Sequence, residues 1–181
     1  MAVITKWSNV SVSVQSALAV AKTITAITKA SQGSVSSTAH GYTNGDYVML
    51  SVQGMYQLNY RVFRVSGVTT DAFLLEGEDT TSYATFVSGS AQKITFGTSL
   101  CYPSKFWFES LWDRADAGLF SLKSASDSQA QRAILFGFAN GQKFVFNGYV
   151  GASLAPTGSA QDLIKTNVTF TALGGPKAYA S

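Results

Sequence analysis

The chain has 181 residues, of which 46% are apolar and only 13% are charged. This length fits one ordinary domain, or a core domain with one small module, and the apolar content is sufficient for a buried core. The net charge of +3 does not indicate a nucleic-acid binder, because the 13 Lys and Arg residues are scattered singly, without a basic patch or arm.

The single cysteine, Cys101, cannot form an intramolecular disulfide, so nothing points to an oxidising compartment. No secretory pattern and no apolar run long enough to span a bilayer is visible, and we expect cytoplasmic synthesis without export. A surface with few charges is easier to bury against neighbours than a Lys- and Glu-rich one. The composition is therefore compatible with self-assembly.

The predicted elements at the start of the chain are short strands. Val10, Val12 and Val14 alternate with serine, which is typical of a half-buried strand, and Thr23–Thr28 continues this pattern. Between about residues 24 and 93, Gly and Asn turns separate further short strands, which predicts a small closed or nearly closed β-structure. The strands expected there are Ser34–Thr38, Asp46–Val52, Tyr60–Val68, Phe73–Leu75 and Thr85–Val87.

A strand that is apolar on both faces is predicted at residues 106–113. Alternate residues of a strand share a face. One face carries Phe106, Phe108 and Trp112, and the other carries Trp107, Glu109, Leu111 and Asp113. Both faces need cover, which comes either from the next helix or from a neighbouring subunit. Trp107 and Leu111 are our candidates for an interface.

A short helix is predicted next, at residues 115–125. Asp113 or Asp116 can cap its first turn. Apolar residues at spacings of four and three form a stripe for packing. The stripe consists of Ala115, Leu119 and Leu122.

A β-hairpin is predicted at residues 133–150. Its loop is Ala139-Asn140-Gly141, with Gly141 left-handed as in a type I turn followed by a bulge. A strict two-residue Asn-Gly turn would place the hairpin's phenylalanines on opposite faces, so the apolar register selects the longer loop. This loop pairs Phe136 with Phe144 and Ile134 with Phe146.

The last predicted strand follows a polar loop containing Pro156 and Gly158. Val168 and Phe170 point inward in this strand. The outward residues are Asn167, Thr169 and Thr171.

The sequence contains no convincing catalytic set. His40 lies in a Gly- and Asn-rich turn, Cys101 has the character of a small apolar filler, and no cluster of metal ligands or phosphate-binding glycine motif is present. Glu109 and Asp113 share a strand face but start about 13 Å apart, a loose fit for paired glycosidase carboxylates. We therefore predict no catalytic residue, no cofactor and no metal site.

The acidic run Glu76-Gly77-Glu78-Asp79, with Asp71 nearby, lacks the alternating ligands and terminal glutamate of a calcium loop. We interpret it as a solvated turn.

The order of hairpin 133–150, loop 153–162 and strand 167–174 resembles the C-terminal half of the major tail tube proteins of long, flexible-tailed bacteriophages. The segments Thr38–Val48 and Gly54–Val65 resemble a small β-module that is inserted in several phage tail proteins. That module is similar in fold to the first catalytic-cysteine half-domain of ubiquitin-activating enzymes, without an adenylating site. The expected division is a tail tube core of residues 1–22 and 95–181 with an inserted module of residues 23–94.

The resemblance implies a mainly β fold, a β-sandwich core with one short flanking helix plus the inserted small β-barrel-like module. It also implies six copies in a ring, with rings stacked into a hollow tube of the virion tail that is assembled in the host cytoplasm and conducts the genome. The implied partners are the chain itself, other tail proteins such as the tape measure and tail terminator, and transiently passing DNA, with no membrane.

The faces of Glu109 and Asp113 and of Asn167, Thr169 and Thr171 are candidates for the lumen or for an inter-subunit contact. Because DNA attracts lysine and arginine, we expect the lumen strands to carry acidic or small polar groups. Two alternatives remain. A carbohydrate-binding β-sandwich would use exposed aromatics such as Trp107, Tyr42 and Tyr149, and a small β-fold hydrolase would depend on Glu109 or Asp113.

Overall fold

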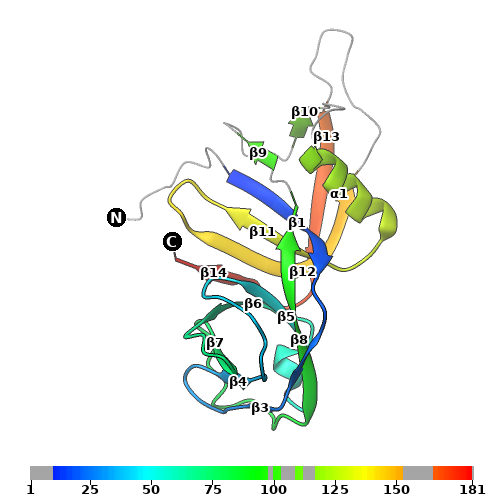
Figure 1. Ribbon diagram of the computed structural model, residues 1–181. Helices are drawn as coiled ribbons and strands as arrows, with labels where there is room; N and C mark the ends of the chain where they lie inside the picture. The colour runs from blue at the N-terminus through cyan, green and yellow to red at the C-terminus, as the bar shows by residue number, and fades with distance from the viewer. Residues whose placement is uncertain (1–9, 98–99, 103–108, 112–116, 153–164, 181) are drawn as a thin grey trace, which may run out of the picture. The chain divides into compact units, whose positions relative to one another are not determined.

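The computed structural model describes residues 10–97, 100–102, 109–111, 117–152 and 165–180. Two compact units are distinguished by their internal contacts. We call the part up to Ser16 and from Phe96 onward the core unit, and Ala17–Thr95 the barrel unit (Figure 1). The expected boundaries followed residues 22 and 94, whereas the observed ones follow Ser16 and Thr95.

The core unit is an antiparallel sheet in the order β10-β13-β12-β11-β1, with β14 also paired to β12 and β9 to β1. Its strands are β1 (Val10–Leu18, which ends in the barrel unit), β9 (Leu100–Tyr102), β10 (Glu109–Leu111), β11 (Arg132–Gly137), β12 (Lys143–Ala152), β13 (Lys165–Ala172) and β14 (Lys177–Tyr179). The long strand β12 pairs with β14 along its first half and with β13 along its second half.

Helix α1 (Ala117–Ser128) packs on one face of this sheet (Figure 1). Its buried Leu122 and Ala125 contact a core made of alternate residues from the strands. The valines of β1 belong to this core because Val12 lies opposite Phe136 and Val14 opposite Ile134. The buried strand residues of the cluster are Val10, Val12, Val14, Ile134, Phe136, Phe146, Val150 and Val168.

The hairpin of β11 and β12 has the predicted register. Phe136 lies opposite Phe144 and Ile134 opposite Phe146. Gly141 is left-handed, with φ 84°, and Phe138 N–H donates to Gln142 O at 2.9 Å across the three-residue loop. Asn140 Oδ1 accepts the Gln142 N–H at 3.1 Å. The predicted three-residue loop is confirmed.

The barrel unit is a closed ring of short strands. The order is β8-β5-β6-β7-β4-β3, and β2 pairs with β8. Only Thr25 separates β2 from β3, and its N–H donates to Ser36 O, so one stretch of chain closes the ring between β8 and β4. The elements are β2 (Lys22–Ile24), β3 (Ala26–Ile27), β4 (Ser34–Ser36), β5 (Tyr47–Gln53), the 3-10 helix η1 (Tyr56–Leu58), β6 (Val62–Ser66), β7 (Ala72–Leu75) and β8 (Ser88–Phe96).

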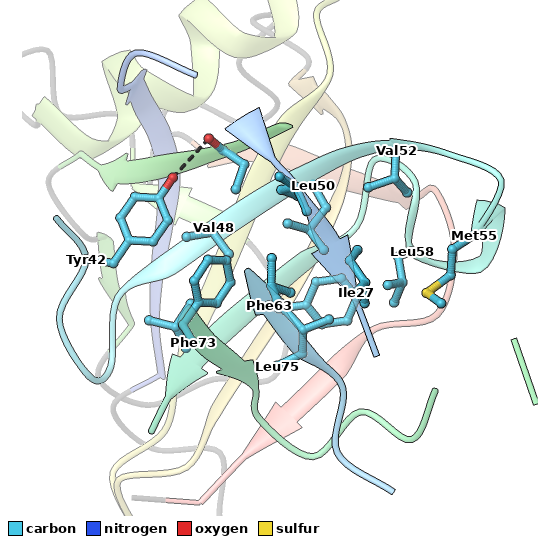
Figure 2. Close-up of a cluster of buried hydrophobic side chains, with 14 residues drawn as sticks. Ile27, Tyr42, Val48, Leu50, Val52, Met55, Leu58, Phe63, Phe73 and Leu75 are labelled. Carbon is cyan, nitrogen blue, oxygen red and sulfur yellow. Dashed lines mark hydrogen bonds between the residues drawn. The ribbon is translucent and has the colours of Figure 1, made fainter. Parts of the chain in front are cut away.

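Figure 2 shows the apolar filling of this ring, in which Val48, Leu50, Phe63 and Phe73 are completely buried. The hydroxyl of Tyr42 donates to Ala91 O at 2.9 Å, so this large ring is buried with its polar group satisfied.

The predicted mainly β fold with one short helix is confirmed, as is the small closed β-structure. The predicted strand Thr85–Val87 is wrong: these residues precede β8, and only the Val87 N–H bond to Gln53 O ties them to β5. The predicted helix exists, but it extends to Ser128. Its expected caps Asp113 and Asp116, and the loop around Pro156, lie outside the described residues.

Candidate functional site

The face of the core sheet opposite α1 contains the candidate residues of β13. Val168 is buried and Phe170 packs against the core, whereas Thr169 and Thr171 are exposed. The predicted alternation is therefore confirmed at these four positions. Asn167 occupies the expected register position, and its side chain lies outside the described part.

The register of β10 brings the two candidate groups together. Glu109 lies opposite Asn167 and Leu111 opposite Lys165 in an antiparallel ladder. Residues directly opposite each other share a face of a sheet. From the sequence, Glu109 and the face of Asn167 are two separate candidates. In the structure their backbone positions are neighbours on one face of the sheet. Trp107 and Asp113 lie outside the described residues.

The neighbouring strand β12 extends this surface. Tyr149 lies opposite Thr171 and Gly151 opposite Thr169. Tyr149 is exposed, and Thr169 Oγ1 donates to Gly151 O at 3.1 Å. A Cβ at Gly151 would meet Thr169 Oγ1 at 2.6 Å, so the glycine makes room for this contact. We call Tyr149, Gly151, Thr169 and Thr171 the neutral face, because this set contains no Lys, Arg, His, Asp or Glu.

The neutral face has the chemistry of a contact surface. Hydroxyl groups and a phenol ring offer hydrogen bonds and stacking, but they provide neither a general base nor a nucleophile activated by one. The hydrolase alternative depends on Glu109 or Asp113. Glu109 is described only by its backbone position, and Asp113 lies outside the described residues, so this arrangement adds no support for a hydrolase.

His40 has a packing role in the barrel unit. Its ring is buried, and Nδ1 accepts the Tyr42 N–H at 3.0 Å while Nε2 lies 3.3 Å from Ala72 O. Phe73 contacts the ring edge to face, with centroids 5.2 Å apart. Both ring nitrogens are thus engaged. Cys101 lies opposite Ser11 in the core unit.

The acidic run is a turn that is solvated only in part: Gly77 and Asp79 are exposed, whereas Glu76 is half-buried and Glu78 is buried, so the interpretation as a solvated turn is wrong for the two glutamates. Arg61 Nη1 donates to Glu78 Oε1 at 2.7 Å, and Arg64 Nε donates to Glu76 Oε2 at 2.6 Å. The Glu78 side chain is only 3% exposed and also accepts the Tyr83 hydroxyl at 2.7 Å. The two glutamates therefore stabilise the barrel unit.

A second polar cluster in the barrel unit surrounds Asp46. Its carboxylate pairs with Lys93 Nζ at 2.8 Å and accepts the Thr43 N–H at 2.9 Å. Burial alone would raise the pKa of Asp46, but the hydrogen bonds from Lys93 and Thr43 and the lysine charge lower it below 3.8. Burial, with a smaller contribution from the Asp46 charge, raises the pKa of Tyr42 to about 12.

Within the described residues no three His, Cys, Asp or Glu side chains are grouped to hold a metal ion. Helix α1 has 12 residues, and the described part of the chain contains no helix with the length and apolar character needed to cross a bilayer. No protein-family profile and no curated protein matches this chain.

Proposed function

We propose that this chain is a structural subunit of the tail of a long-tailed bacteriophage, and that its copies assemble into stacked hexameric rings forming the tail tube. The genome passes through this tube during ejection. The subunit acts by assembling and by offering DNA a surface to which it does not adhere, without catalysis.

The observation that supports this proposal most directly is the two-sided core sheet. One face is filled by aromatic and aliphatic groups under α1, while the neutral face presents threonine, tyrosine and glycine. Positively charged surfaces hold DNA because phosphate contacts release counterions. A wall of hydroxyl groups offers no such attraction. The registers also place charged positions on the same face of the sheet: Glu109 and Lys165 on β10 and β13, and Lys143 and Lys177 on β12 and β14.

The barrel unit would lie on the outside of the tube, because a lumen that admits duplex DNA leaves little room for a further domain. Its strands close on themselves and leave no long edge for pairing with other chains. In this proposal the core unit makes the ring, and the barrel unit decorates it.

Electron microscopy of the negatively stained protein tests the proposal. We expect hexameric rings or tubes, at high concentration or after seeding with preformed tubes. A protein that remains monomeric under all these conditions would contradict it.

The variant Thr171→Lys tests the role of the neutral face, with Thr171→Ser as the control. If this face lines the lumen, Thr171→Lys tubes form normally and retain a short DNA duplex at low salt, and high salt releases it. If the face is an inter-subunit contact instead, Thr171→Lys prevents assembly. Thr171→Ser behaves as the original chain in either case.

Carbohydrate binding is a second candidate. The predicted exposure of Tyr42 is wrong, since it is buried, but Tyr56 is 71% exposed and Tyr60 is 50% exposed in the barrel unit. Aromatic rings with an accessible face are common in binding surfaces. A monomeric chain that binds glycans, and loses binding with Tyr56→Ala and Tyr60→Ala, would favour this function over the tube.

A further inference from the structure

A cleft of about 320 Å³ lies in the core unit between α1 and the ends of strands β1 and β11. The strands contribute one amide, one hydroxyl and one guanidinium group, and the helix contributes two hydroxyls and an aromatic ring. The lining residues are Gln15, Ser16, Phe120, Ser121, Ser124, Ala125 and Arg132.

Arg132 is the charged group of this cleft. Of the arginines whose side chains are described, Arg61 and Arg64 each pair with a glutamate, whereas Arg132 has no carboxylate partner in this part of the chain. Its side chain is half-buried at the first position of β11. A guanidinium group in such a place favours a carboxylate, which it can bind with two parallel hydrogen bonds.

The other residues that line the cleft can also contact a carboxylate-bearing side chain. Gln15 is buried, and its Oε1 accepts the Ala133 N–H at 3.1 Å, which orients its amide. Ser124 is exposed on the helix, one turn from Phe120, a residue that is 53% exposed. The cleft therefore offers hydrogen-bond donors beside an uncovered apolar wall.

The size of the cleft limits the occupant. Its volume lies near the lower end of the range for ligand pockets, which is roughly 300–1,000 Å³. This is room for one or two side chains, and it excludes a helix or a nucleic-acid duplex. Unpaired carboxylates are available on the chain itself, since Asp71 and Asp79 are exposed and have no cation partner within the described residues.

We propose that this cleft receives a carboxylate-bearing side chain from a second copy of this chain, with Arg132 binding the carboxylate and Phe120 covering the adjacent carbon atoms. This inference rests on the proposed function, because it requires that copies of the chain assemble. It adds a specific contact between subunits that is separate from the neutral face.

The test compares the protein concentration at which tubes form for the original chain, Arg132→Glu, Ser124→Trp and the control Lys29→Glu. Lys29 is exposed in the barrel unit, so Lys29→Glu makes the same charge change outside the cleft and outside the neutral face. We expect Arg132→Glu to raise the concentration required roughly tenfold or more, because it places like charges together. Ser124→Trp fills the cleft without a charge change and has the same effect. Lys29→Glu remains within about twofold of the original.

If thermal unfolding shows that Arg132→Glu does not fold, Ser124→Trp alone tests whether the cleft is a contact between subunits. If both cleft variants assemble like the original chain, the cleft proposal is wrong while the tube proposal stands. Equal effects of Arg132→Glu and Lys29→Glu also overturn it, because net charge would then explain the change. If the original chain never assembles, the proposed function itself is wrong, and the cleft has no partner copy.

Discussion

The carboxylate of Glu78 shows how single residues stabilise the barrel unit. It accepts from Arg61 Nη1 and from the Tyr83 hydroxyl, both at 2.7 Å, and the Arg61 guanidinium also lies 4.9 Å from the ring centre of Phe63. A buried charge is tolerated when its lone pairs are satisfied in this way. Arg64 and Glu76 form a similar but more exposed pair.

Replacing Glu78 with alanine should lower the free energy of unfolding by about 3 kcal/mol, because it leaves the Arg61 guanidinium without its counter-ion in a nearly buried position. The control Glu76→Ala removes a more exposed carboxylate and should cost about 1 kcal/mol or less. Urea unfolding measures both values. Equal losses would show that burial of the Glu78 pair does not matter.

Asp46→Asn should alter the pH dependence of stability. The pKa of Asp46 is lower in the folded chain than its usual 3.8, so its stabilisation is present above pH 3.8 and disappears as the pH falls through the folded value. We expect Asp46→Asn to be less stable than the original chain by about 0.5–1 kcal/mol at pH 7, a small value because the pair of Asp46 and Lys93 is partly exposed. At the lowest pH the two chains should be equally stable, because Asp46 is then protonated and uncharged.

Unfolding by urea at several pH values measures this change. The control is Asp71→Asn, which removes a carboxylate that pairs with no cation among the described side chains and accepts one backbone N–H. A constant difference between Asp46→Asn and the original chain at every pH would show that the Lys93 pair does not stabilise the fold.

At the scale of elements, the β11–β12 hairpin sets the geometry of the core unit. The three-residue loop places Phe136, Phe144 and Phe146 on one face, where Phe136 and Phe146 stack with their centroids 6.0 Å apart. The opposite face of β12 then presents Tyr149 and Gly151 beside β13. A loop shorter by one residue would exchange the two faces of one strand.

Gly141→Ala should weaken this hairpin. Gly141 has φ 84°, and a side chain in the left-handed region costs about 1–2 kcal/mol. The control Gly175→Ala should be nearly neutral, because no atom within 4 Å would meet the new Cβ. Thermal unfolding of the two variants measures the difference, and a Gly141→Ala variant as stable as the original would show that the loop relaxes without cost.

At the scale of the whole molecule, the barrel unit is an insertion whose two ends lie together. In the core unit, Gly97 N–H donates to Val14 O at 2.9 Å, close to the points where the chain leaves and returns. In the barrel unit, Ala19 N–H donates to Lys93 O at 2.8 Å. Each unit also has its own buried apolar cluster. These features are typical of separately folding domains.

Replacing residues 17–95 with a short Gly/Ser linker should leave a core unit that unfolds cooperatively, because its ends are already hydrogen-bonded neighbours and its apolar cluster remains complete. Circular dichroism during thermal unfolding measures the cooperativity. A broad, non-cooperative transition would show that the barrel unit is required for folding of the core.

The sequence by itself determined the mainly β fold, the hairpin register and the closed character of the barrel unit. These features follow from local alternation and from turn residues such as Gly141, which act over a few positions. Strand β8 escaped prediction because Ser88-Gly-Ser-Ala-Gln-Lys-Ile-Thr-Phe96 is polar and contains glycine. Its backbone pairing with β5 and β2 stabilises it instead.

Only the tertiary structure decided which distant residues meet. The pairing of Arg61 with Glu78, the neighbouring positions of Glu109 and Asn167, and the cleft around Arg132 all join segments that are separated along the chain. Side-chain alternation assigns a residue to a face, but it does not say which strand lies beside it. That choice depends on the packing of the whole sheet, because partners are selected by the combined burial of many side chains.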